Sequence, residues 1–476
     1  MKNFKKLTIF LVIATVVLFV FLLFRYFANK KEPVVKTRDY KEIVASDTIV
    51  AVVSANPIDY FIYHGRPMGF QLEILQQFAE DHELVLKIIV ENDLNSGVEM
   101  LLNRECDILA QSIVINTDND LVHEFTVPVR ETKQVLVQRK PEDFIMLTYD
   151  QIEDTLVRSL SELDGKTLYA YKGSVSKTAM QNLSHEIAEN FYIEEVDSIS
   201  PEQIIYYVAQ GKFDYAICDE SIAKVAQSYY PNIDIKTDLS LPQSIAWGIR
   251  PESVELLDTV NTWLENFKQT PDYNKFCLRY INNNRILVDI NSEFYSGNEG
   301  KISNYDDLIK KYAHIPGWDW RLISSLIYEE SRFNESVVSW AGAYGLMQLM
   351  PFIYTKFAPD SVSGVEAHIA AGANYLAFLE TKIPENVQDS ATAVKMLLAG
   401  YNIGFGHVED AICLAEKYNE NSASWDVISF YLTNLSNPKY FNDTCVKHGY
   451  ISGIYAVNFA NNIAERFEHY KNVIPE

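Results

Sequence analysis

The spacing of apolar residues divides the chain into three stretches. Residues 7–24 (LTIFLVIATVVLFVFLLF) form one apolar run without a charged residue. Between about 46 and 285, β-branched runs of strand length alternate with segments of helical spacing, a pattern typical of α/β layers around a mostly parallel sheet. Between 301 and 476 the helical period dominates. We therefore expect a multi-domain chain in which an α/β part precedes a mainly α part.

The middle stretch predicts specific elements. It opens with the strand pattern TIVAVVS (48–54), and GFQLEILQQFAEDH (69–82) then has helical spacing. Further strands are expected at 85–90, 106–114, 166–174, 214–218 and 244–250, and further helices at 97–102, 201–210 and 254–267. The strand at 166–174 ends in Gly173-Ser174, where backbone N–H groups at a helix start could hold an anion.

The first stretch is long enough to cross a bilayer. At about 1.5 Å per residue, residues 7–24 span roughly 27 Å as a helix, whereas the apolar core of a signal peptide is usually about 7–15 residues long. No small-x-small cleavage site follows before the basic residues, and no cysteine lies nearby for a lipid anchor. The pattern favours an uncleaved anchor over a cleaved signal, with the orientation left open by basic residues on both sides. Either alternative exports residues 32–476 from the cytoplasm.

Composition and charge narrow the range of functions. The 476 residues are 48% hydrophobic and 13% aromatic, which suits large cores and excludes a mainly disordered chain. The formal net charge of -23 disfavours binding to nucleic acid, and we expect no such partner. Residues 46–300 hold most of this acidity, with 19 basic and 41 acidic residues, against 13 and 20 in residues 301–476. The five cysteines form no C-x-x-C motif.

Short motifs in the middle stretch occur in a characteristic order. They are Gly69-Phe70, Asp107-Ile108-Leu109-Ala110, Phe125-Thr126-Val127-Pro128, Tyr171-Lys172-Gly173-Ser174, Phe213-Asp214-Tyr215 and Trp247-Gly248. Together they resemble the extracellular solute-binding proteins of family 3, which are periplasmic amino-acid receptors. The resemblance implies a periplasmic-binding-protein-like domain of two α/β lobes, joined by two crossing strands and closing on a ligand. Lobe 1 would take about 46–138 and 240–280, and lobe 2 about 140–238.

One position departs from this family. After the strand equivalent to 107–114, family members carry a threonine-x-x-arginine segment whose arginine clamps the ligand α-carboxylate. Asn119 stands in that place here, and a neutral amide cannot replace a guanidinium fork. Asp219 matches the lobe 2 acid that faces a ligand amine, with a capping carboxylate as the alternative. The candidate sensor residues are thus Asp219, Asn119 and Ser174, and a peptide or muropeptide suits them better than a free amino acid; a scaffold without a ligand is the alternative.

One helix of the last stretch places a charge on its apolar side. In DWRLISSLIYEESRF (319–333), the leucines and isoleucines between 322 and 327 form one stripe, and helical geometry puts Glu330 on it and Glu329 at its edge. An ionised carboxylate there is costly unless it is paired or protonated, and a raised pKa suits a general acid. The alternative is that Glu330 pairs with a base such as Arg332.

Three ordered motifs favour the catalytic interpretation. They are Glu-Ser-Arg-Phe (330–333), Gly-Ala-x-Gly-Leu-Met-Gln (342–348) and Tyr-Asn-x-Gly-x-Gly (401–406). They strongly resemble the soluble lytic transglycosylase domain, which is related in fold to goose-type lysozyme, over about 301–476. Carried over, the resemblance implies that Glu330 is the single catalytic acid/base and that Ser331 helps to orient it. The other implied substrate-binding residues are Met347, Gln348, Tyr401 and Asn402.

The resemblance also implies a reaction. Hydrolases usually place two carboxylates across the glycosidic bond, but no motif marks a partner for Glu330 among Asp306, Asp307, Asp319 and Glu335. Glu330 would protonate the oxygen between N-acetylmuramic acid and N-acetylglucosamine, and the C6 hydroxyl would then close a 1,6-anhydro ring without water. No metal or cofactor is expected. The alternatives are a lysozyme-type hydrolysing muramidase and a non-catalytic receptor for wall or solute.

The C-terminal end leaves several points open. The family usually carries a last-helix tyrosine near the glutamate, but the aligned position here is Phe459, and Tyr455 lies one helical turn away as a possible substitute. Cys413 and Cys445 could form a disulfide outside the cytoplasm or stay as two thiols. The motif at 342–348 is expected to form a turn and then a short helix that Pro351 ends.

The expected organisation combines these parts. An anchor or signal segment (1–31) and a linker (32–45) precede the solute-binding-like domain (46–285), and a second linker (286–300) leads to the catalytic domain (301–476). This order predicts a bacterial envelope enzyme, held at the membrane with its other domains in the periplasm. Its expected partners are peptidoglycan strands and a ligand that regulates activity through the binding domain.

Overall fold

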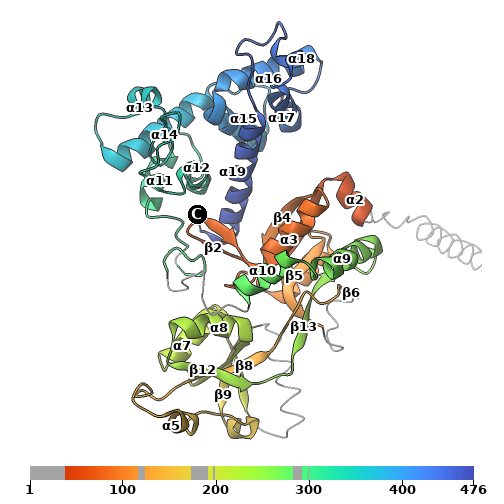
Figure 1. Ribbon diagram of the computed structural model, residues 1–476, viewed down its shortest axis with the longest axis vertical. Coiled ribbons are helices and arrows are strands. Elements are labelled where there is room, and N and C mark those ends of the chain that lie inside the picture. The colour runs from red at the N-terminus through yellow and green to blue at the C-terminus, as the bar shows by residue number, and fades with distance from the viewer. Residues whose placement is uncertain are drawn as a thin grey trace, which may run out of the picture.

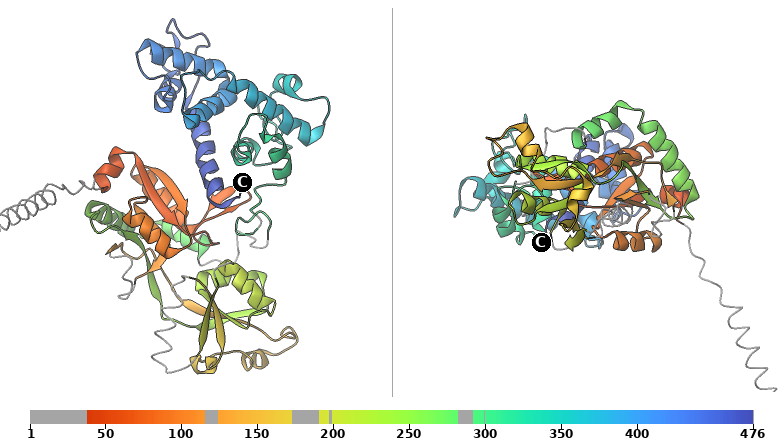
Figure 2. Two further views of the ribbon diagram at one scale, coloured as in Figure 1. Left: turned by 180° about the vertical axis from the view of Figure 1, so that it is seen from behind. Right: turned by 90° about the horizontal axis from the view of Figure 1, so that it is seen from below.

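The structure is a computed structural model of the full chain. It describes residues 38–115, 124–172, 191–196, 199–281, 292–298 and 300–475. The predicted membrane segment 7–24, Asn119 and Ser174 lie outside these residues. Within the described part of the chain, no helix has the length and apolar character needed to cross a bilayer. Figure 1 shows two α/β lobes, one above the other, and a helical domain at the far end of the molecule, and Figure 2 shows the same arrangement from behind.

Lobe 1 is built on a six-stranded mixed sheet with the order β4-β1-β5-β13-β6, in which β7 also pairs with β13. Its strands are β1 (Thr48–Val53), β4 (Val85–Val90), β5 (Ile108–Val114), β6 (Glu124–Phe125), β7 (Arg130–Thr132) and β13 (Gln243–Ile249). Its helices are α2 (Tyr40–Ala45), α3 (Phe70–Asp81), α4 (Leu94–Leu102), α9 (Val254–Phe267) and α10 (Pro271–Tyr280). Strands β1, β4 and β5 run parallel, as expected for strands that alternate with helices.

Lobe 2 contains a second, five-stranded sheet with the order β10-β9-β11-β8-β12. Its strands are β8 (Gln134–Arg139), β9 (Thr167–Tyr171), β10 (Tyr192–Val196), β11 (Tyr215–Asp219) and β12 (Ile233–Asp238). Its α-helices are α5 (Tyr149–Glu153), α7 (Pro201–Ala209) and α8 (Glu220–Tyr229). The chain crosses between the lobes twice, from β7 to β8 and from β12 back to β13. The predicted two-lobed α/β architecture with two crossings is therefore confirmed.

The third part of the molecule is a helical domain. Its helices are α11 (Asp306–Ala313), α12 (Trp320–Ser331), α13 (Pro351–Phe357), α14 (Gly364–Glu380), α15 (Ser390–Ile403), α16 (Phe405–Lys417), α17 (Trp425–Asn434), α18 (Pro438–Phe441) and α19 (Ile454–Val473). Leu326 of α12, Leu398 of α15 and Ile463 of α19 are fully buried in one core. Cys413 and Cys445 are free thiols in the structure.

A small hairpin of lobe 1 packs against the helical domain. It consists of β2 (Phe61–Tyr63) and β3 (Arg66–Met68), both strands contact α19, and Figure 1 shows β2 beside the C-terminal end of that helix. Ile62 is fully buried in the helical core, and the Tyr470 hydroxyl donates a hydrogen bond to the Gly65 carbonyl at 2.6 Å. Gly65 has φ 74°, and a Cβ there would lie 2.9 Å from the Phe333 ring, so this close approach requires glycine.

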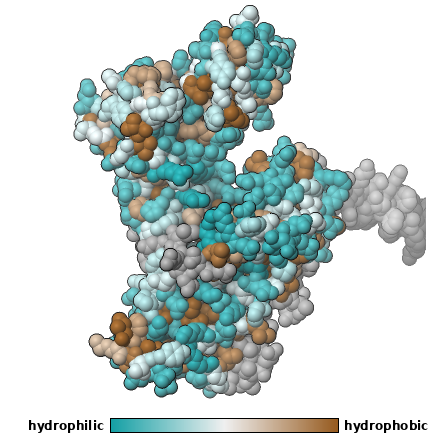
Figure 3. Space-filling model, in the orientation of Figure 1, coloured by the Kyte–Doolittle hydropathy of each residue, from teal (hydrophilic) through white to brown (hydrophobic). Residues whose placement is uncertain are grey.

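Further contacts fix the hairpin side of lobe 1 to α19. The Tyr60 hydroxyl lies 2.8 Å from His469 Nδ1, and the Asn472 amide donates to the Ile88 carbonyl at 2.9 Å. Away from this contact the surface is hollowed between the helical domain and lobe 1, and the visible face is mainly hydrophilic (Figure 3). The two domains thus touch through a short, specific set of contacts.

One local prediction is wrong. Residues 344–349 form no helix: Tyr344 and Leu349 pair across a tight turn, and α13 begins at Pro351 rather than ending there. Proline suits the first position of a helix because its missing N–H would have no intrahelical acceptor there, and its fixed φ is already helical. Pro351 is therefore a start signal.

Candidate active site

The candidate catalytic glutamate lies in the last turn of α12. Asp319 caps the start of this helix by accepting a hydrogen bond from the Arg321 backbone N–H at 2.8 Å, and Arg332 ends it in the left-handed conformation with φ 50°. The predicted apolar stripe is buried, with Leu326 and Ile327 fully inaccessible. This buried face fixes the rotation of α12 about its axis and therefore the direction in which the Glu330 side chain leaves the helix.

The two adjacent glutamates of α12 have different partners. The Glu329 carboxylate forms an ion pair with Arg466 of α19 at 2.8 Å and accepts a hydrogen bond from Asn462 at 3.2 Å. Among the ion pairs of the described residues, none includes Glu330, and Arg332 is exposed. The alternative in which Arg332 neutralises Glu330 therefore has no support in the structure.

The surroundings of Glu330 favour its protonated form. Burial raises the pKa of Glu330 to about 8, and the nearby negative charge of Glu329 adds to the rise. Arg466 pairs with Glu329, so this cation does not neutralise Glu330. A carboxyl group with this pKa carries its proton at neutral pH, as a general acid requires, and can take a proton back after it has given one away.

The three sequence motifs converge on the glutamate. The Ser331 hydroxyl donates a hydrogen bond to the Leu346 carbonyl at 2.8 Å, and the Tyr401 hydroxyl donates to the Met347 carbonyl at 2.7 Å. Two consecutive carbonyls of the 342–348 loop are thus held from α12 and from α15. Burial raises the pKa of the Tyr401 phenol, and the charge of Glu330 adds to the rise.

The loop itself is locked by packing. The Met347 side chain is fully buried and packs so closely on Gly372 of α14 that a Cβ there would overlap its sulfur. Gln348 has φ 43°, and its side-chain amide donates hydrogen bonds to the Val337 and Gly345 carbonyls at 3.0 and 2.9 Å. These two residues therefore hold the shape of the loop around Glu330.

Two acidic residues that precede Glu330 in the sequence have structural partners. Asp306 is 4% exposed and accepts hydrogen bonds from the backbone N–H groups of Ile302 and Ser303, both at 2.8 Å. Asp319 forms an ion pair with Arg321 at 2.6 Å. Both carboxylates are engaged, so neither offers the second carboxylate of a two-acid hydrolase.

Two predicted residues lie apart from this network. Asn402 is exposed near the end of α15, and Tyr455 is 73% exposed in the first turn of α19. No hydrogen bond between described residues joins either of them to Glu330. Phe459, one turn further along α19, is 8% exposed and packs in the helical core.

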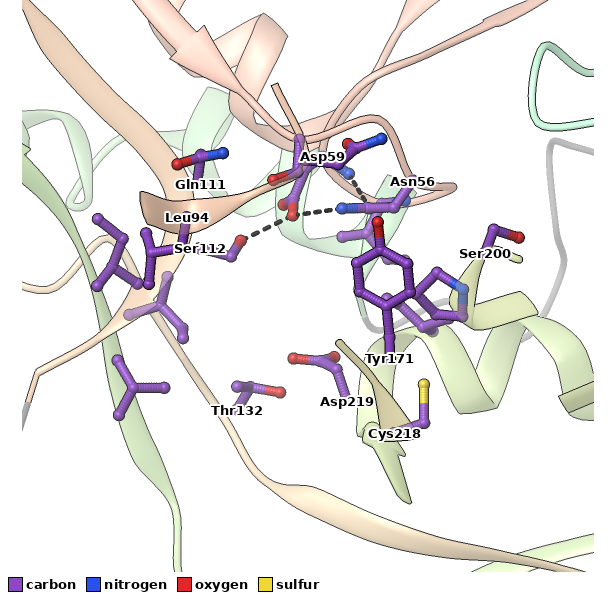
Figure 4. A pocket seen from close by; sticks show the side chains of 18 of the residues that line it. Asn56, Asp59, Leu94, Gln111, Ser112, Thr132, Tyr171, Ser200, Cys218 and Asp219 are labelled. Atoms are coloured by element: carbon purple, nitrogen blue, oxygen red, sulfur yellow. Dashed lines mark hydrogen bonds between the residues drawn. The ribbon is translucent and has the colours of Figure 1, made fainter. Parts of the chain in front are cut away.

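A second site lies between the lobes. Figure 4 shows Asp219, at the end of β11, and Asp59 projecting into one cavity from opposite sides. One oxygen of Asp59 accepts hydrogen bonds from the Asn56 amide at 2.9 Å and from the Ser112 hydroxyl at 2.7 Å. Asp219 also caps α8 by accepting from the Ser221 N–H at 2.8 Å, so its capping role and its position at the cavity coexist.

Sequence reasoning missed several residues of both sites. Asp59 follows β1 in an Asn-Pro-Ile-Asp segment whose polar ends could have marked a strand-end site. Arg130, which also lines the cavity, and Arg466, which pairs with Glu329, had no local signal because tertiary packing alone brings them to their partners.

Comparison with known proteins finds matches for both the α/β part and the helical part of the chain. The family model of bacterial extracellular solute-binding proteins, family 3, matches residues 48–283, and that of the transglycosylase SLT domain matches residues 307–424. The membrane-bound lytic murein transglycosylase F of Desulfosudis oleivorans is 26% identical over 424 residues, which cover 88% of this chain and 89% of that protein. Its counterpart in Sodalis glossinidius is 26% identical over 430 residues, covering 87% and 85%. Among solved structures, holo ArgBP from T. maritima is 20% identical over 49% of this chain and 96% of its own, with a TM-score of 0.41.

These matches first define the class: the chain is a lytic transglycosylase that carries a solute-binding domain of family 3. Within that class, it is similar along most of its length to the membrane-bound lytic murein transglycosylase F proteins.

Proposed function

We propose that the chain cleaves the β-1,4 bond between N-acetylmuramic acid and N-acetylglucosamine in peptidoglycan and leaves a 1,6-anhydromuramoyl end. The observation that carries this proposal is that Glu330 has no ion-pair partner among the described residues, while burial and Glu329 raise its pKa to about 8. A single protonated carboxyl group can serve as acid and then as base, and this reaction needs no second carboxylate.

The proposed reaction has two proton transfers. Glu330 gives its proton to the glycosidic oxygen as the bond from C1 to that oxygen breaks, and the muramyl N-acetyl group stabilises the cationic C1. The Glu330 carboxylate then takes the proton of the C6 hydroxyl while that oxygen bonds to C1. The enzyme returns to its starting state and no water is consumed. Intramolecular attack has a high effective molarity, which favours ring closure over hydrolysis.

The residues around Glu330 have supporting roles in this proposal. Ser331 and Tyr401 hold the loop carbonyls of Leu346 and Met347, and so fix the wall of the saccharide groove. Met347 and Gln348 also belong to the proposed groove, because they shape the loop. Asn402 and Tyr455 belong to it as well, since their exposed side chains are available to sugar.

We further propose that the cleft between the lobes senses a ligand, such as a wall peptide, and biases catalysis. A ligand does this only if it binds two arrangements of the lobes with different affinity. The hairpin offers a route for the signal, because Ile62 follows Asp59 by three residues and packs in the helical core, while Gly65 touches Phe333 just beyond Glu330. Asp219 is the candidate ligand residue in lobe 2, and Asn119 and Ser174 stay predictions.

The location of the enzyme follows from the same proposal. Residues 7–24 would hold it at the membrane, with the linker 32–45 leading to the sensor domain 46–285 and the linker 286–300 to the catalytic domain 301–476, both domains in the periplasm.

The test is mass analysis of products released from purified peptidoglycan by the wild type and by Glu330→Gln, side by side. We expect anhydromuramoyl ends from the wild type and almost none from the variant. Hydrated reducing ends would identify a hydrolysing muramidase, and equal release by both proteins would refute the assignment of Glu330.

A further inference from the structure

The helical domain contains two cysteines, one on α16 and one in the segment between α18 and α19. On α16, Asp410, Cys413 and Lys417 are spaced by three and four residues, so their side chains lie along one side of the helix. The segment of residues 443–448 carries the second cysteine, Cys445. The other three cysteines of the chain lie in the α/β lobes. A link within the helical domain would therefore join α16 to the chain just before α19.

Both ends of this segment are fixed to that side of α16. At its start, Lys417 Nζ forms an ion pair with the Asp443 carboxylate at 2.6 Å. At its end, the Asp410 carboxylate accepts hydrogen bonds from the backbone N–H groups of Lys447 and His448 at 2.7 and 2.9 Å. Asp410 is 2% exposed, so these bonds are shielded from water. The segment is thus held at two points that lie on either side of Cys413 along the helix.

Cys445 lies between these two points of attachment. Its backbone N–H donates a hydrogen bond to Asp443 Oδ1 at 3.0 Å, and the Val446 N–H donates to the Asp443 carbonyl at 3.0 Å, which closes a turn. Both thiols are half-buried. Burial raises the pKa of the Cys445 thiol to about 12, and a hydrogen bond with Cys413 adds to the rise. The fold therefore presents the two thiols to one another from anchored backbone.

The same segment packs on one of the motifs around the candidate active site. A Cβ on Gly406, the last residue of the motif at 401–406, would lie 2.5 Å from His448 Nε2, so the imidazole rests directly on this glycine. The rings of His448 and His407 have their centroids 5.8 Å apart. Whatever holds the segment on α16 therefore also supports the turn between α15 and α16.

We propose that Cys413 and Cys445 form an oxidisable dithiol, which closes to a disulfide and fastens the 443–448 segment to α16. The structure shows its reduced form. The pairing does not depend on the proposed glycan chemistry. Its persistence in the cell rests on the export proposed above, because oxidising compartments preserve disulfides and the cytoplasm reduces them.

The oxidant is a disulfide carried by a small molecule or by another protein. One thiolate of the pair attacks a sulfur of that disulfide, which forms a mixed disulfide and releases the first thiol of the oxidant. The second thiolate then attacks the chain's own sulfur in the mixed disulfide and releases the second thiol. The chain loses two electrons and two protons, and the oxidant takes them up as two thiols.

The test starts from reduced full-length protein in a glutathione buffer at pH 8 with the oxidised form in excess, until the number of free thiols is constant. The remaining thiols are alkylated in denaturant and the digested peptides are weighed. We expect Cys413 and Cys445 in one linked pair of peptides, with Cys106, Cys218 and Cys277 alkylated. Alkylation of both Cys413 and Cys445, or glutathione adducts in place of the link, would overturn the proposal.

Thermal unfolding tests whether the link fastens the segment. The bridge joins residues 32 positions apart, so oxidation should raise the Tm of the helical domain by at least about 5 °C. Cys413→Ser and Cys445→Ser should each abolish this shift, whereas Cys277→Ser, in α10, is the matched control and should keep it. A linked pair without a rise in Tm would refute the fastening role. Peptidoglycan cleavage enters none of these readouts, so a protein that forms the link but does not cleave would refute the proposed reaction and leave this inference standing.

Discussion

Two regions of the molecule hold a carboxyl group that is largely or partly shielded from water, and they surround it differently. In the cleft between the lobes, Asp59 lies beside the Arg130 guanidinium and accepts two hydrogen bonds. In the helical domain, the charged neighbour that acts on Glu330 is another acid, Glu329, which itself pairs with Arg466. Burial raises the pKa of both groups.

The difference separates binding from proton transfer. A carboxyl group next to a cation and two hydrogen-bond donors is held in place by its partners and suits binding. A carboxyl group without such partners stays protonated and can give its proton to a substrate. The environment, rather than burial alone, therefore decides which chemistry each region supports.

The largest expected effect comes from removing the acid of the helical domain. Glu330→Gln keeps the shape of the side chain but has no proton to transfer, so the rate of peptidoglycan cleavage should fall by at least about a hundredfold. The rate of release of soluble fragments measures this loss. Glu335→Gln, at an exposed position of the same region, is the control and should stay within about twofold of the wild type.

The same substitution should change stability in a pH-dependent way. The pKa of Glu330 rises from 4.5 to about 8 on folding, so the folded state binds more protons between these values and loses stability as the pH rises through them. Glu330→Gln has no group to ionise, and above pH 8 it should be more stable than the wild type by a few kcal/mol, on the order of 1.4 kcal/mol per pKa unit. Denaturant unfolding at several pH values tests this, and an equal difference at pH 4 and pH 9 would contradict the raised pKa.

Removing the neighbouring negative charge should lower the pKa of Glu330. Glu329→Gln removes a negative charge and leaves Arg466 without its ion-pair partner, so both changes lower the pKa of Glu330. The alkaline limb of the pH–activity profile should move to lower pH, because the acid loses its proton earlier. A limb that stays in place would show that Glu329 does not influence the acid.

The smallest expected effect concerns the loop that supports the glutamate. Tyr401→Phe removes the hydroxyl that donates to the Met347 carbonyl and should lower the free energy of unfolding by about 1 kcal/mol. Ser331→Ala should do the same through the Leu346 carbonyl. Because these carbonyls are consecutive, the double variant should lose an amount different from the sum. Strict additivity, measured by thermal unfolding, would show that the two hydroxyls act independently.

The sequence was sufficient to predict an element where the spacing of apolar residues within that element indicates its type. Residues 254–267 fold as the predicted helix because Leu256, Val260 and Leu264 recur at helical spacing and are fully buried. The prediction that Pro351 ends a helix is wrong because proline occurs both after the end of a helix and at its start. The pairing of Tyr344 with Leu349 across a turn shows that the helix begins at Pro351. The pairing of Glu329 with Arg466 and the position of Arg130 beside Asp219 required the structure, because in each pair the partner comes from a distant segment of the chain.

The most direct test of the difference between the two carboxyl groups is titration of Glu330 itself. Infrared difference spectra of the full-length protein, wild type minus Glu330→Gln, isolate the carbonyl band of the protonated group as the pH is raised. The band should disappear with a midpoint near pH 8. A midpoint near the ordinary value of 4.5 would mean that Glu330 is ionised at neutral pH and would contradict its role as the acid.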